Sequence, residues 1–599
     1  MAIFSIHKVS YPESKNEFRL KGGSRILGYI RQFSATEKVI LGVLVITAAF
    51  SALAMTGMIS SYFLIEVPGK GGQIREGLVG LPHNINPVLA ITDVDNDIAT
   101  LVYSGLMKYD GQDLETDLAE SYKISDDGLV YAFKLKSGLY FQDGTPLTSD
   151  DIAYTIQKIQ DPGLRSPLRS NWTDVTTTVI GPLEIKFTLK KPFRPFLTNT
   201  TVGILPKHIW SSMNNDQFAL DERNIEPIGS GPYKIASIER KSNIPVEYRL
   251  TTWTKYYSKK PYIPTISFVF FADRDKALSA LETKTIDSLG SISPSEAVGL
   301  DENVNSDYEI RTTTLPRIFG LFFNQNQNPV LADKNVREAL EMTVDREALV
   351  KTILLGYGLA IDGPLPEYAK SINQNNLETR NDLSSAIPLL EKAGAVYLLE
   401  KNGWKKNVTT GIYEKKNAKN VVQSLIFDIY TVDTPDLKKT AEMIRDSWKA
   451  LGASVEVKVF ESADLYQNII KTRKYDILLF GEHIGKDNDI YAFWHSSQRN
   501  APGLNVAMYT NNKVDALLDE IRTSDDAQIR EKKYVELKEI IKKDIPAIFL
   551  YSPNFIYVTP KSLGGLDLGS LITASDRLNS IQNWYVNTEK IWKIFVNKI

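Results

Sequence analysis

Five histidines and two glycine- or aspartate-rich segments are the residues of this 599-residue chain whose types could support catalysis or metal binding. The histidines show neither the H-E-x-x-H spacing nor any pairing that a zinc site needs. Residues 93–97 begin like a calcium loop, but Ile98 and Ser104 stand where that loop requires a glycine and a bidentate glutamate. Residues 229–234 lack the spacing of a phosphate loop, and no G-x-S-x-G motif occurs. The sequence therefore predicts no catalytic residues, no metal and no cofactor.

The elements that would position a site are interleaved helices and strands, without a repeat. Periodicity predicts helices over residues 93–107, 148–159, 335–355, 383–394, 436–451, 512–522 and 526–543. Alternation and β-branched or aromatic runs predict strands over residues 131–135, 184–189, 246–252, 265–271, 319–324, 423–430, 454–459, 477–480 and 547–551. We therefore expect a mixed α/β body built around several sheets.

Size and composition narrow the class of protein. The chain after residue 65 is far longer than the roughly 250–300 residues at which one hydrophobic core stops growing, so at least two lobes are expected. The absence of cysteine excludes disulfides, thiolate metal sites and a lipid-modified cysteine. The whole chain has a net charge of −2 and a basic head, so the body is acidic. This sign argues against nucleic acid as a partner.

A charge-free apolar run covers residues 39–65. At about 1.5 Å of rise per residue, it is long enough to cross a hydrocarbon core of roughly 30 Å. The head, residues 1–38, contains more basic than acidic residues, and basic flanks stay on the cytoplasmic side. We predict a single-pass membrane helix with a cytoplasmic N-terminus and a body outside. The alternative is a cleaved signal peptide whose cleavage site would be the A-L-A segment at residues 52–54, although the head and the apolar run are both long for one.

The order of local motifs in the body resembles one known family. The motifs are L-A-E-S-Y-K-I-S-D-D-G at 118–128, Y-A-F-K-L-K at 131–136, F-Q-D-G-T-P-L-T-S-D-D-I at 141–152, G-S-G-P-Y-K at 229–234, F-F-N at 322–324, V-R-E-A-L at 336–340, D-R at 345–346, Y-D at 475–476, F-W-H-S-S at 493–497, Asn505, and residues 511–518. This series resembles the peptide/nickel family of extracellular solute-binding proteins, the receptors of dipeptide and oligopeptide ABC importers. The resemblance spans almost the whole body.

The resemblance implies an α/β, two-lobed periplasmic-binding-protein-like fold with an inserted subdomain. Lobe I would comprise residues 71–110, 228–313 and 555–599, the inserted subdomain residues 111–227, and lobe II residues 314–554. Two strand crossings, near residues 315–319 and 552–557, would form a hinge. The lobes would close around a ligand that contacts both of them.

The same resemblance places ligand contacts on both lobes. We expect lobe II to contribute a polar loop over residues 480–491, which has two glycines and few periodic apolar positions. Its candidate contacts are Phe480, Gly481, Glu482, His483, Lys486, Asp487 and Asp489. Lobe I would contribute Ile91, Thr92 and Asp93, next to a helix N-terminus suited to an anionic group.

The identity of the ligand stays open at this point. In peptide-binding members an aspartate of the lobe II loop pairs with the amino terminus of the ligand. Here Lys486 stands at that position and Asp489 at an acidic position three residues later, while Asp487 could substitute. These carboxylates could bind an amine or only cap the backbone.

We therefore expect an anchored receptor that captures short peptides and passes them to the permease and ATPase subunits of an ABC importer. A monomer without enzymatic activity is expected. The alternative is the same fold used as a sensor or structural ectodomain for a non-peptide ligand, and an anchored peptidase ranks third.

Overall fold

The computed structural model describes residues 33–111, 113–303, 307–365, 387–485, 488–524, 526–569 and 571–593. The chain forms two compact units. The first unit comprises Met1–Val67 and Thr588–Ile599, and the second comprises Pro68–Asn587.

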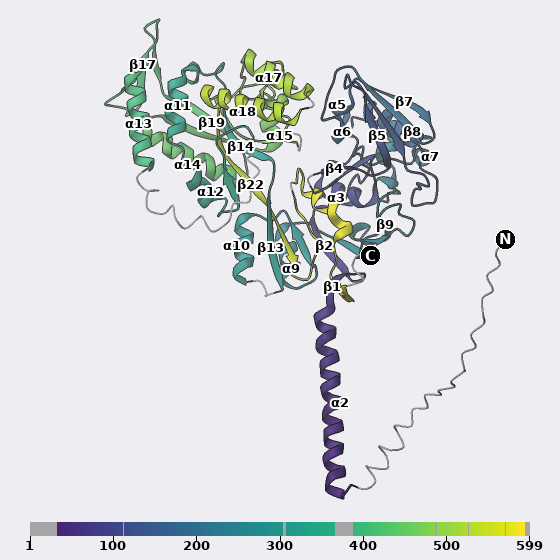
Figure 1. The fold of residues 1–599 in the computed structure, drawn as a ribbon. Coiled ribbons are helices and arrows are strands. Elements are labelled where there is room, and N and C mark those ends of the chain that lie inside the picture. The colour runs from purple at the N-terminus through teal and green to yellow at the C-terminus, as the bar shows by residue number, and fades with distance from the viewer. Residues whose placement is uncertain are drawn as a thin grey trace, which may run out of the picture. The chain divides into compact units, whose positions relative to one another are not determined.

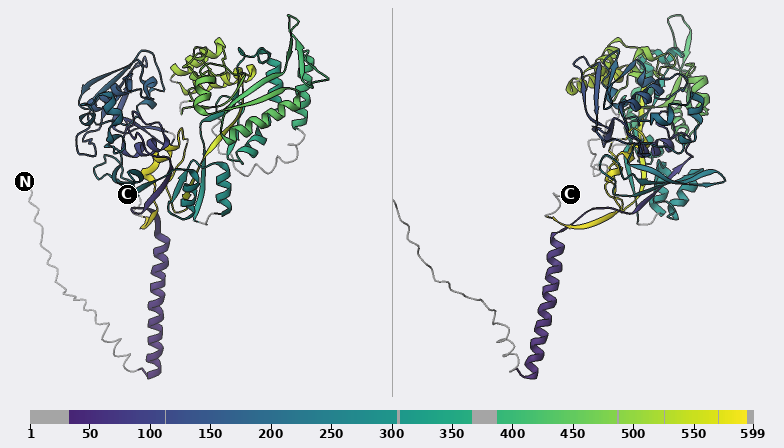
Figure 2. Two further views of the ribbon diagram at one scale, coloured as in Figure 1. Left: turned by 180° about the vertical axis from the view of Figure 1, so that it is seen from behind. Right: turned by 90° about the vertical axis from the view of Figure 1, so that its right-hand side faces the viewer.

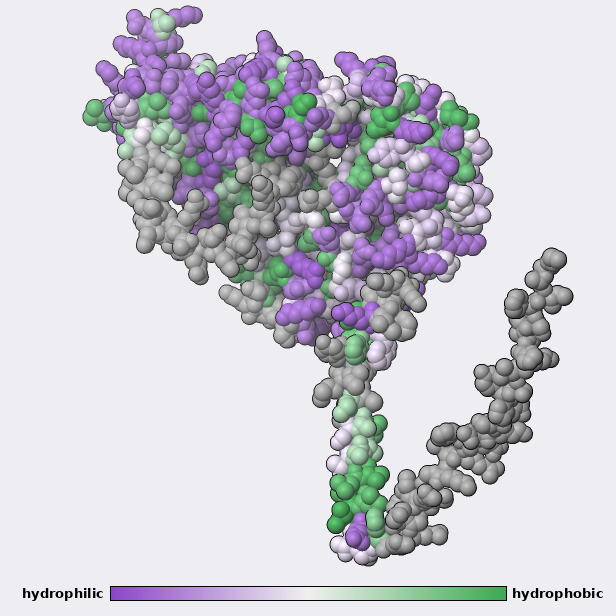
Figure 3. Space-filling view, in the orientation of Figure 1, coloured by the Kyte–Doolittle hydropathy of each residue, from purple (hydrophilic) through white to green (hydrophobic). Residues whose placement is uncertain are grey.

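The first unit is built on one long helix, α2 (Ala35–Phe63), of 29 residues. Its segment Ala35–Leu53 is long and apolar enough to cross a membrane, and Figure 3 shows hydrophobic side chains along it. The helix passes directly into β1 (Leu64–Gly69), which pairs with β23 (Asn587–Trp592) from the other end of the chain. The rings of Phe63 and Trp592 stack with centroids 6.3 Å apart. The end of the helix is therefore held against the last strand.

The second unit is organised by a sheet with the strand order β20-β19-β21-β14-β22-β12-β2-β11-β10-β9, to which β13 and β15 add by pairing with β22. The bounds in chain order are β2 (Gln73–Val79), β9 (Tyr233–Lys241), β10 (Ile244–Thr252), β11 (Thr265–Phe271), β12 (Ser288–Gly290), β13 (Tyr308–Thr314), β14 (Arg317–Phe323), β15 (Gly358–Ala360), β19 (Ile426–Val432), β20 (Ser454–Phe460), β21 (Ile477–His483) and β22 (Ala547–Pro560). The molecule is thus a mixed α/β protein in which distant segments share one sheet (Figure 1).

Helices accompany this sheet along the chain. They are α3 (Asp93–Val102), α9 (Arg274–Glu282), α10 (Pro294–Asn303), α11 (Lys334–Met342), α12 (Arg346–Ile353), α13 (Ile387–Lys401), α14 (Pro435–Leu451), α16 (Tyr491–Trp494), α17 (Asn512–Thr523), α18 (Ala527–Asp544) and the 3-10 helix η6 (Ala574–Asn583). Small sheets are formed by β3 (Met107–Asp110) with β4 (Asp113–Thr116), and by β16 (Lys405–Lys406), β17 (Tyr413–Lys416) and β18 (Val422–Ser424).

A separate antiparallel sheet lies in the segment predicted to be inserted. Its order is β5-β6-β8-β7, with β5 (Ala119–Ile124), β6 (Val130–Leu135), β7 (Val175–Gly181) and β8 (Glu184–Leu189). Helix α4 (Ser149–Gln160) begins with a capping box between Thr148 and Asp151. In the left view of Figure 2, this dark-blue group of elements and the green group around α13 and α14 lie on opposite sides.

Two chain crossings join the lobes. Strand β22 pairs first with β14, through residues 547–551, and then with β13, through residues 554–560. Between β13 and β14 the chain crosses at Leu315 and Pro316, and the Ser552 hydroxyl donates to the Leu315 carbonyl at 2.8 Å. The predicted strand at 547–551 is therefore too short, because β22 continues through the second predicted crossing as one strand.

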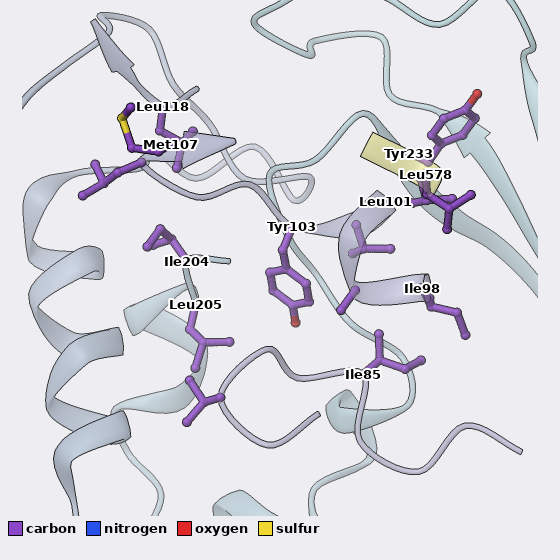
Figure 4. Close-up of a cluster of buried hydrophobic side chains, with 14 of the residues drawn as sticks. Ile85, Ile98, Leu101, Tyr103, Met107, Leu118, Ile204, Leu205, Tyr233 and Leu578 are labelled. Atoms are coloured by element: carbon purple, nitrogen blue, oxygen red, sulfur yellow. The ribbon is translucent and has the colours of Figure 1, made fainter. Parts of the chain in front are cut away.

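The apolar cores divide along the same line. One core joins buried residues between Ile74 and Phe270 with residues between Phe555 and Trp584, and it includes the inserted segment. Figure 4 shows part of it, where Ile98 and Leu101 of α3 lie with Tyr233 of β9 and Leu578 of η6. Two further cores fill the region from Ile318 to Tyr551, on either face of β14 and β21.

A buried charge network closes the first of these regions. Arg577 of η6 is 2% exposed and pairs with Asp97 of α3 at 2.6 Å and with Glu76 of β2 at 2.9 Å. The Tyr557 hydroxyl, from β22, donates to Glu76 at 2.7 Å. Because two buried carboxylates face one buried guanidinium, each charge depends on the others to offset its desolvation. Four distant segments are thus held together.

Two predicted helices differ from the structure for local reasons. The predicted helix over 335–355 is two helices, because the Asp345 side chain accepts from the Ala348 N–H at 2.8 Å and starts α12 anew. The predicted helix over 93–107 ends at Val102, since the chain extends at Tyr103. Gly105 follows, and a Cβ there would lie 2.4 Å from the Thr201 carbonyl oxygen.

Candidate functional site

The lobe I candidates lie at the N-terminus of α3. Thr92 is its N-cap: its hydroxyl accepts from the Asp95 N–H at 3.1 Å and donates to the Asp95 carboxylate at 2.7 Å. The Thr92 side chain is therefore used within the helix. Ile91 is 76% exposed. Asp93 is also exposed, and among the described residues no donor bonds to its carboxylate. Of the three, Asp93 has an available charged group.

The sequence predicted that the lobe II candidates lie in a loop. In the structure, several of them belong to a strand instead. Strand β21 continues through His483, so Phe480, Gly481, Glu482 and His483 pair with β14. The periodicity was obscured because a buried Glu follows a Gly at the end of an apolar strand. Successive side chains on a strand alternate between its faces, so Glu482 and His483 point in opposite directions.

Glu482 faces the core of lobe II. Its cross-strand partner is Ile318, which belongs to the apolar core with Phe480 and Trp494. The Glu482 side chain is 2% exposed, and neither carboxyl oxygen has a hydrogen-bond partner among the described residues. Desolvation raises the pKa of this carboxyl well above its ordinary value. Burial therefore favours the neutral form of Glu482, whose side chain points away from the face that carries His483.

His483 meets Arg317, a residue that was not singled out from the sequence. The two are cross-strand partners at the ends of β21 and β14, and the Arg317 Nε donates to His483 Nε2 at 2.7 Å. Desolvation and the nearby guanidinium lower the pKa of His483 to about 4. The imidazole is thus neutral near pH 7 and can accept this hydrogen bond. The signal in the sequence was an arginine within the predicted crossing at residues 315–319.

Asp93 and Arg317 act on each other electrostatically without forming an ion pair. Partial desolvation and the neighbouring Asp97 raise the pKa of Asp93, while Arg577 and Arg317 oppose that shift. Desolvation lowers the pKa of Arg317, and Asp93 opposes that shift. An acid on lobe I and a base on lobe II therefore lie within reach of each other's field. This arrangement suits a ligand that carries both charges.

Asp489 is already paired. The Arg522 guanidinium of α17 holds its carboxylate with two nitrogens, at 2.6 and 3.0 Å, and lies over the Tyr491 ring at 3.8 Å. Arg522 also lies 5.4 Å from the Phe193 ring of the inserted segment. Lys486 and Asp487, the other charged candidates of the loop, lie outside the described residues. Across the described part of the chain, no cluster of His, Asp and Glu could hold a metal ion.

Comparisons with known proteins find relatives that match most of this chain. The oligopeptide-binding protein AppA of Bacillus subtilis is 27% identical over 547 residues, which cover 88% of this chain and 96% of AppA. The structure of AppA with a nonapeptide matches with a TM-score of 0.65 at 26% identity, over 87% of this chain and 100% of that one.

A second solved structure is similar to the same extent. NikZ from Campylobacter jejuni, in complex with Ni(L-His), matches with a TM-score of 0.65 at 25% identity, over 86% of this chain and 99% of that one. The family model described as bacterial extracellular solute-binding proteins, family 5 Middle, matches residues 113–502. The two-lobed fold, the paired crossings and these matches together place the chain: it belongs to the family 5 extracellular solute-binding proteins.

Proposed function

We propose that this protein captures short peptides between its lobes, outside the cytoplasm, and delivers them to the permease and ATPase subunits of an ABC importer. The observation that carries this proposal is a pair of opposite charges that influence each other electrostatically, Asp93 at the start of α3 and Arg317 at the start of β14. A peptide has an amine and a carboxylate, so it complements both groups. The matched oligopeptide-binding relative supports the same class of ligand.

In this proposal Asp93 receives the amino group of the ligand. Its carboxylate has no hydrogen-bond donor among the described residues. Its raised pKa means that the negative charge is destabilised at this position, and a cation would stabilise it. Asp489 is a weaker candidate, because Arg522 donates to both of its oxygens. Asp487 remains a second candidate for the amine on sequence grounds.

Helix α2 completes the proposal as a retained anchor, and the protein acts as a monomer. An anchor keeps the receptor near its permease and so raises its effective concentration there. The family consists of binding proteins, and no turnover of the bound peptide is expected.

The test is native mass spectrometry of the full-length protein in detergent with a mixture of di- to pentapeptides. We expect complexes of one peptide per protein, with peptides recovered intact. Asp93→Asn should weaken binding by about thirty-fold or more, the cost of leaving one partner of a desolvated charge pair alone. Asp216→Asn, an exposed acid of the inserted segment, serves as the control with the same charge change. Hydrolysed peptides, or no complexes with any peptide, would contradict the proposal.

A further inference from the structure

Arg317 has hydrogen-bonding capacity that the protein does not use. It is the first residue of β14 and is half-buried, directly after the crossing at Leu315 and Pro316. Its Nε donates to His483 Nε2 at 2.7 Å. Among the described residues, no acceptor bonds to its two terminal nitrogens. Taking a guanidinium partly out of water is costly unless an anion compensates for the lost hydration.

Three other arginines of the described chain, all buried or half-buried, use their terminal nitrogens within the protein. The terminal nitrogens of Arg337 donate to the carbonyls of Leu331, Ala332 and Asp544. Those of Arg577 donate to two carboxylates, and Arg522 pairs with Asp489. Arg317 therefore differs from these arginines in presenting an unused pair of N–H donors.

His483 positions Arg317 without neutralising it. Because Nε2 accepts from the guanidinium, the imidazole proton is on Nδ1, and the ring carries no charge. A carboxylate at this place would have cancelled the positive charge, whereas a neutral ring fixes the orientation of the side chain and leaves the charge available. The guanidinium is thus oriented by one nitrogen, and no described residue accepts a hydrogen bond from the other two.

The anion that completes this site does not come from the described protein. Asp93 is the carboxylate whose field reaches Arg317, but no ion pair joins them. We propose that Arg317 binds the C-terminal carboxylate of the ligand through two parallel N–H···O bonds, with His483 as the positioning residue. This inference rests on the proposed function, and it defines the ligands as short peptides with a free carboxyl end. A planar guanidinium matches the two oxygens of a carboxylate in this geometry.

The test compares two peptide mixtures on the full-length protein in detergent. Both contain di- to pentapeptides with free amino ends and without Asp or Glu, one as free acids and the other as C-terminal amides. The variants are Arg317→Gln and Arg317→Lys, with Arg445→Gln as the matched control. Arg445 lies on α14 of the same lobe and pairs only with its neighbour Asp446 among the described residues, so its loss changes the charge equally.

The wild-type protein should bind the acids about thirty-fold or more tightly than the amides. Arg317→Gln should abolish this preference, Arg317→Lys should keep part of it, and Arg445→Gln should keep all of it. Equal binding of acids and amides by the wild type overturns the inference alone, and this comparison requires no variant to fold. Retained preference in Arg317→Gln overturns it too. If neither mixture binds, the proposed function fails along with it.

Discussion

At the scale of single residues, Glu482 places a carboxylic acid within an apolar core. It is 2% exposed, has no hydrogen-bond partner in the described part of the chain, and its pKa is raised by desolvation. In the unfolded chain the same carboxyl ionises at its ordinary pKa of about 4.3. Between the two pKa values the folded state binds one more proton than the unfolded state. The contribution of Glu482 to the free energy of unfolding is therefore fully present below about pH 4. It decreases as the pH rises towards the folded pKa.

The Glu482→Gln variant should not lose stability as the pH rises, because glutamine has nearly the same shape as glutamate and cannot ionise. We expect wild type and variant to have similar melting temperatures near pH 4.5. The variant should gain about 1.4 kcal/mol relative to wild type for each further pH unit, until the folded pKa is reached. Thermal melts of both proteins from pH 4.5 to 8.5 measure the effect, with the exposed Glu456→Gln as control. A constant difference between wild type and Glu482→Gln at all pH values would show that Glu482 titrates normally.

At the scale of elements, Arg522 joins α17 to the loop before α16 and approaches the inserted segment. Its side chain and that of Asp489 are 27% and 22% exposed, so their charge pair is partly shielded from water. We expect Arg522→Gln to lower the free energy of unfolding by about 1–3 kcal/mol. Asp489→Asn should have a similar effect, and the double variant should cost less than the sum of the two. Chemical denaturation of the four proteins measures this coupling.

The control for that cycle lies on the same helix. Lys513 pairs with Glu536 of α18, and both side chains are more exposed, at 64% and 47%. An exposed pair contributes little, so Lys513→Gln should change stability by less than about 1 kcal/mol. Additive effects of Arg522→Gln and Asp489→Asn would mean that the pair is not coupled, and Asp489 would then be free for another partner.

Much of the element pattern could be predicted from the sequence, because helices and strands leave local periodicity. The predicted strand at 184–189 and the helix at 436–451 agree with β8 and α14 within a residue. The site could be predicted only in part. Arg317 and His483 are 166 residues apart, and their contact depends on the register of two strands. Local patterns carry no information on register across such a distance, so the arginine was missed and the end of β21 was predicted as loop.

At the scale of the whole molecule, retention of α2 decides how the receptor is held. If α2 is an anchor, the full-length protein should remain with membranes after washing with high salt. Protease added to spheroplasts should digest the body and spare the head, because the basic flank keeps the head inside. Immunoblots against each end of the chain measure both outcomes. Recovery of a soluble chain that begins near residue 56 would instead identify a cleaved signal peptide.

A control addresses the possible cleavage site directly. Signal peptidase requires small residues, and Ala52 and Ala54 would supply them. Ala54→Leu should leave the distribution between membrane and soluble fractions unchanged for an anchor. The same variant should shift the protein to the membrane fraction if cleavage normally occurs.

The Arg577 network has a consequence for how the protein is made. Glu76 and Arg577 are 501 residues apart in the chain, yet they meet in one buried ion pair. At a synthesis rate of about 5–20 residues per second, Arg577 is synthesised roughly 25–100 s after Glu76 and Asp97. During that interval the first lobe lacks the cation that makes burial of its two acids tolerable. Completion of this lobe is therefore delayed until the last segment has been translated, and the nascent chain is exposed to proteases and chaperones throughout the wait.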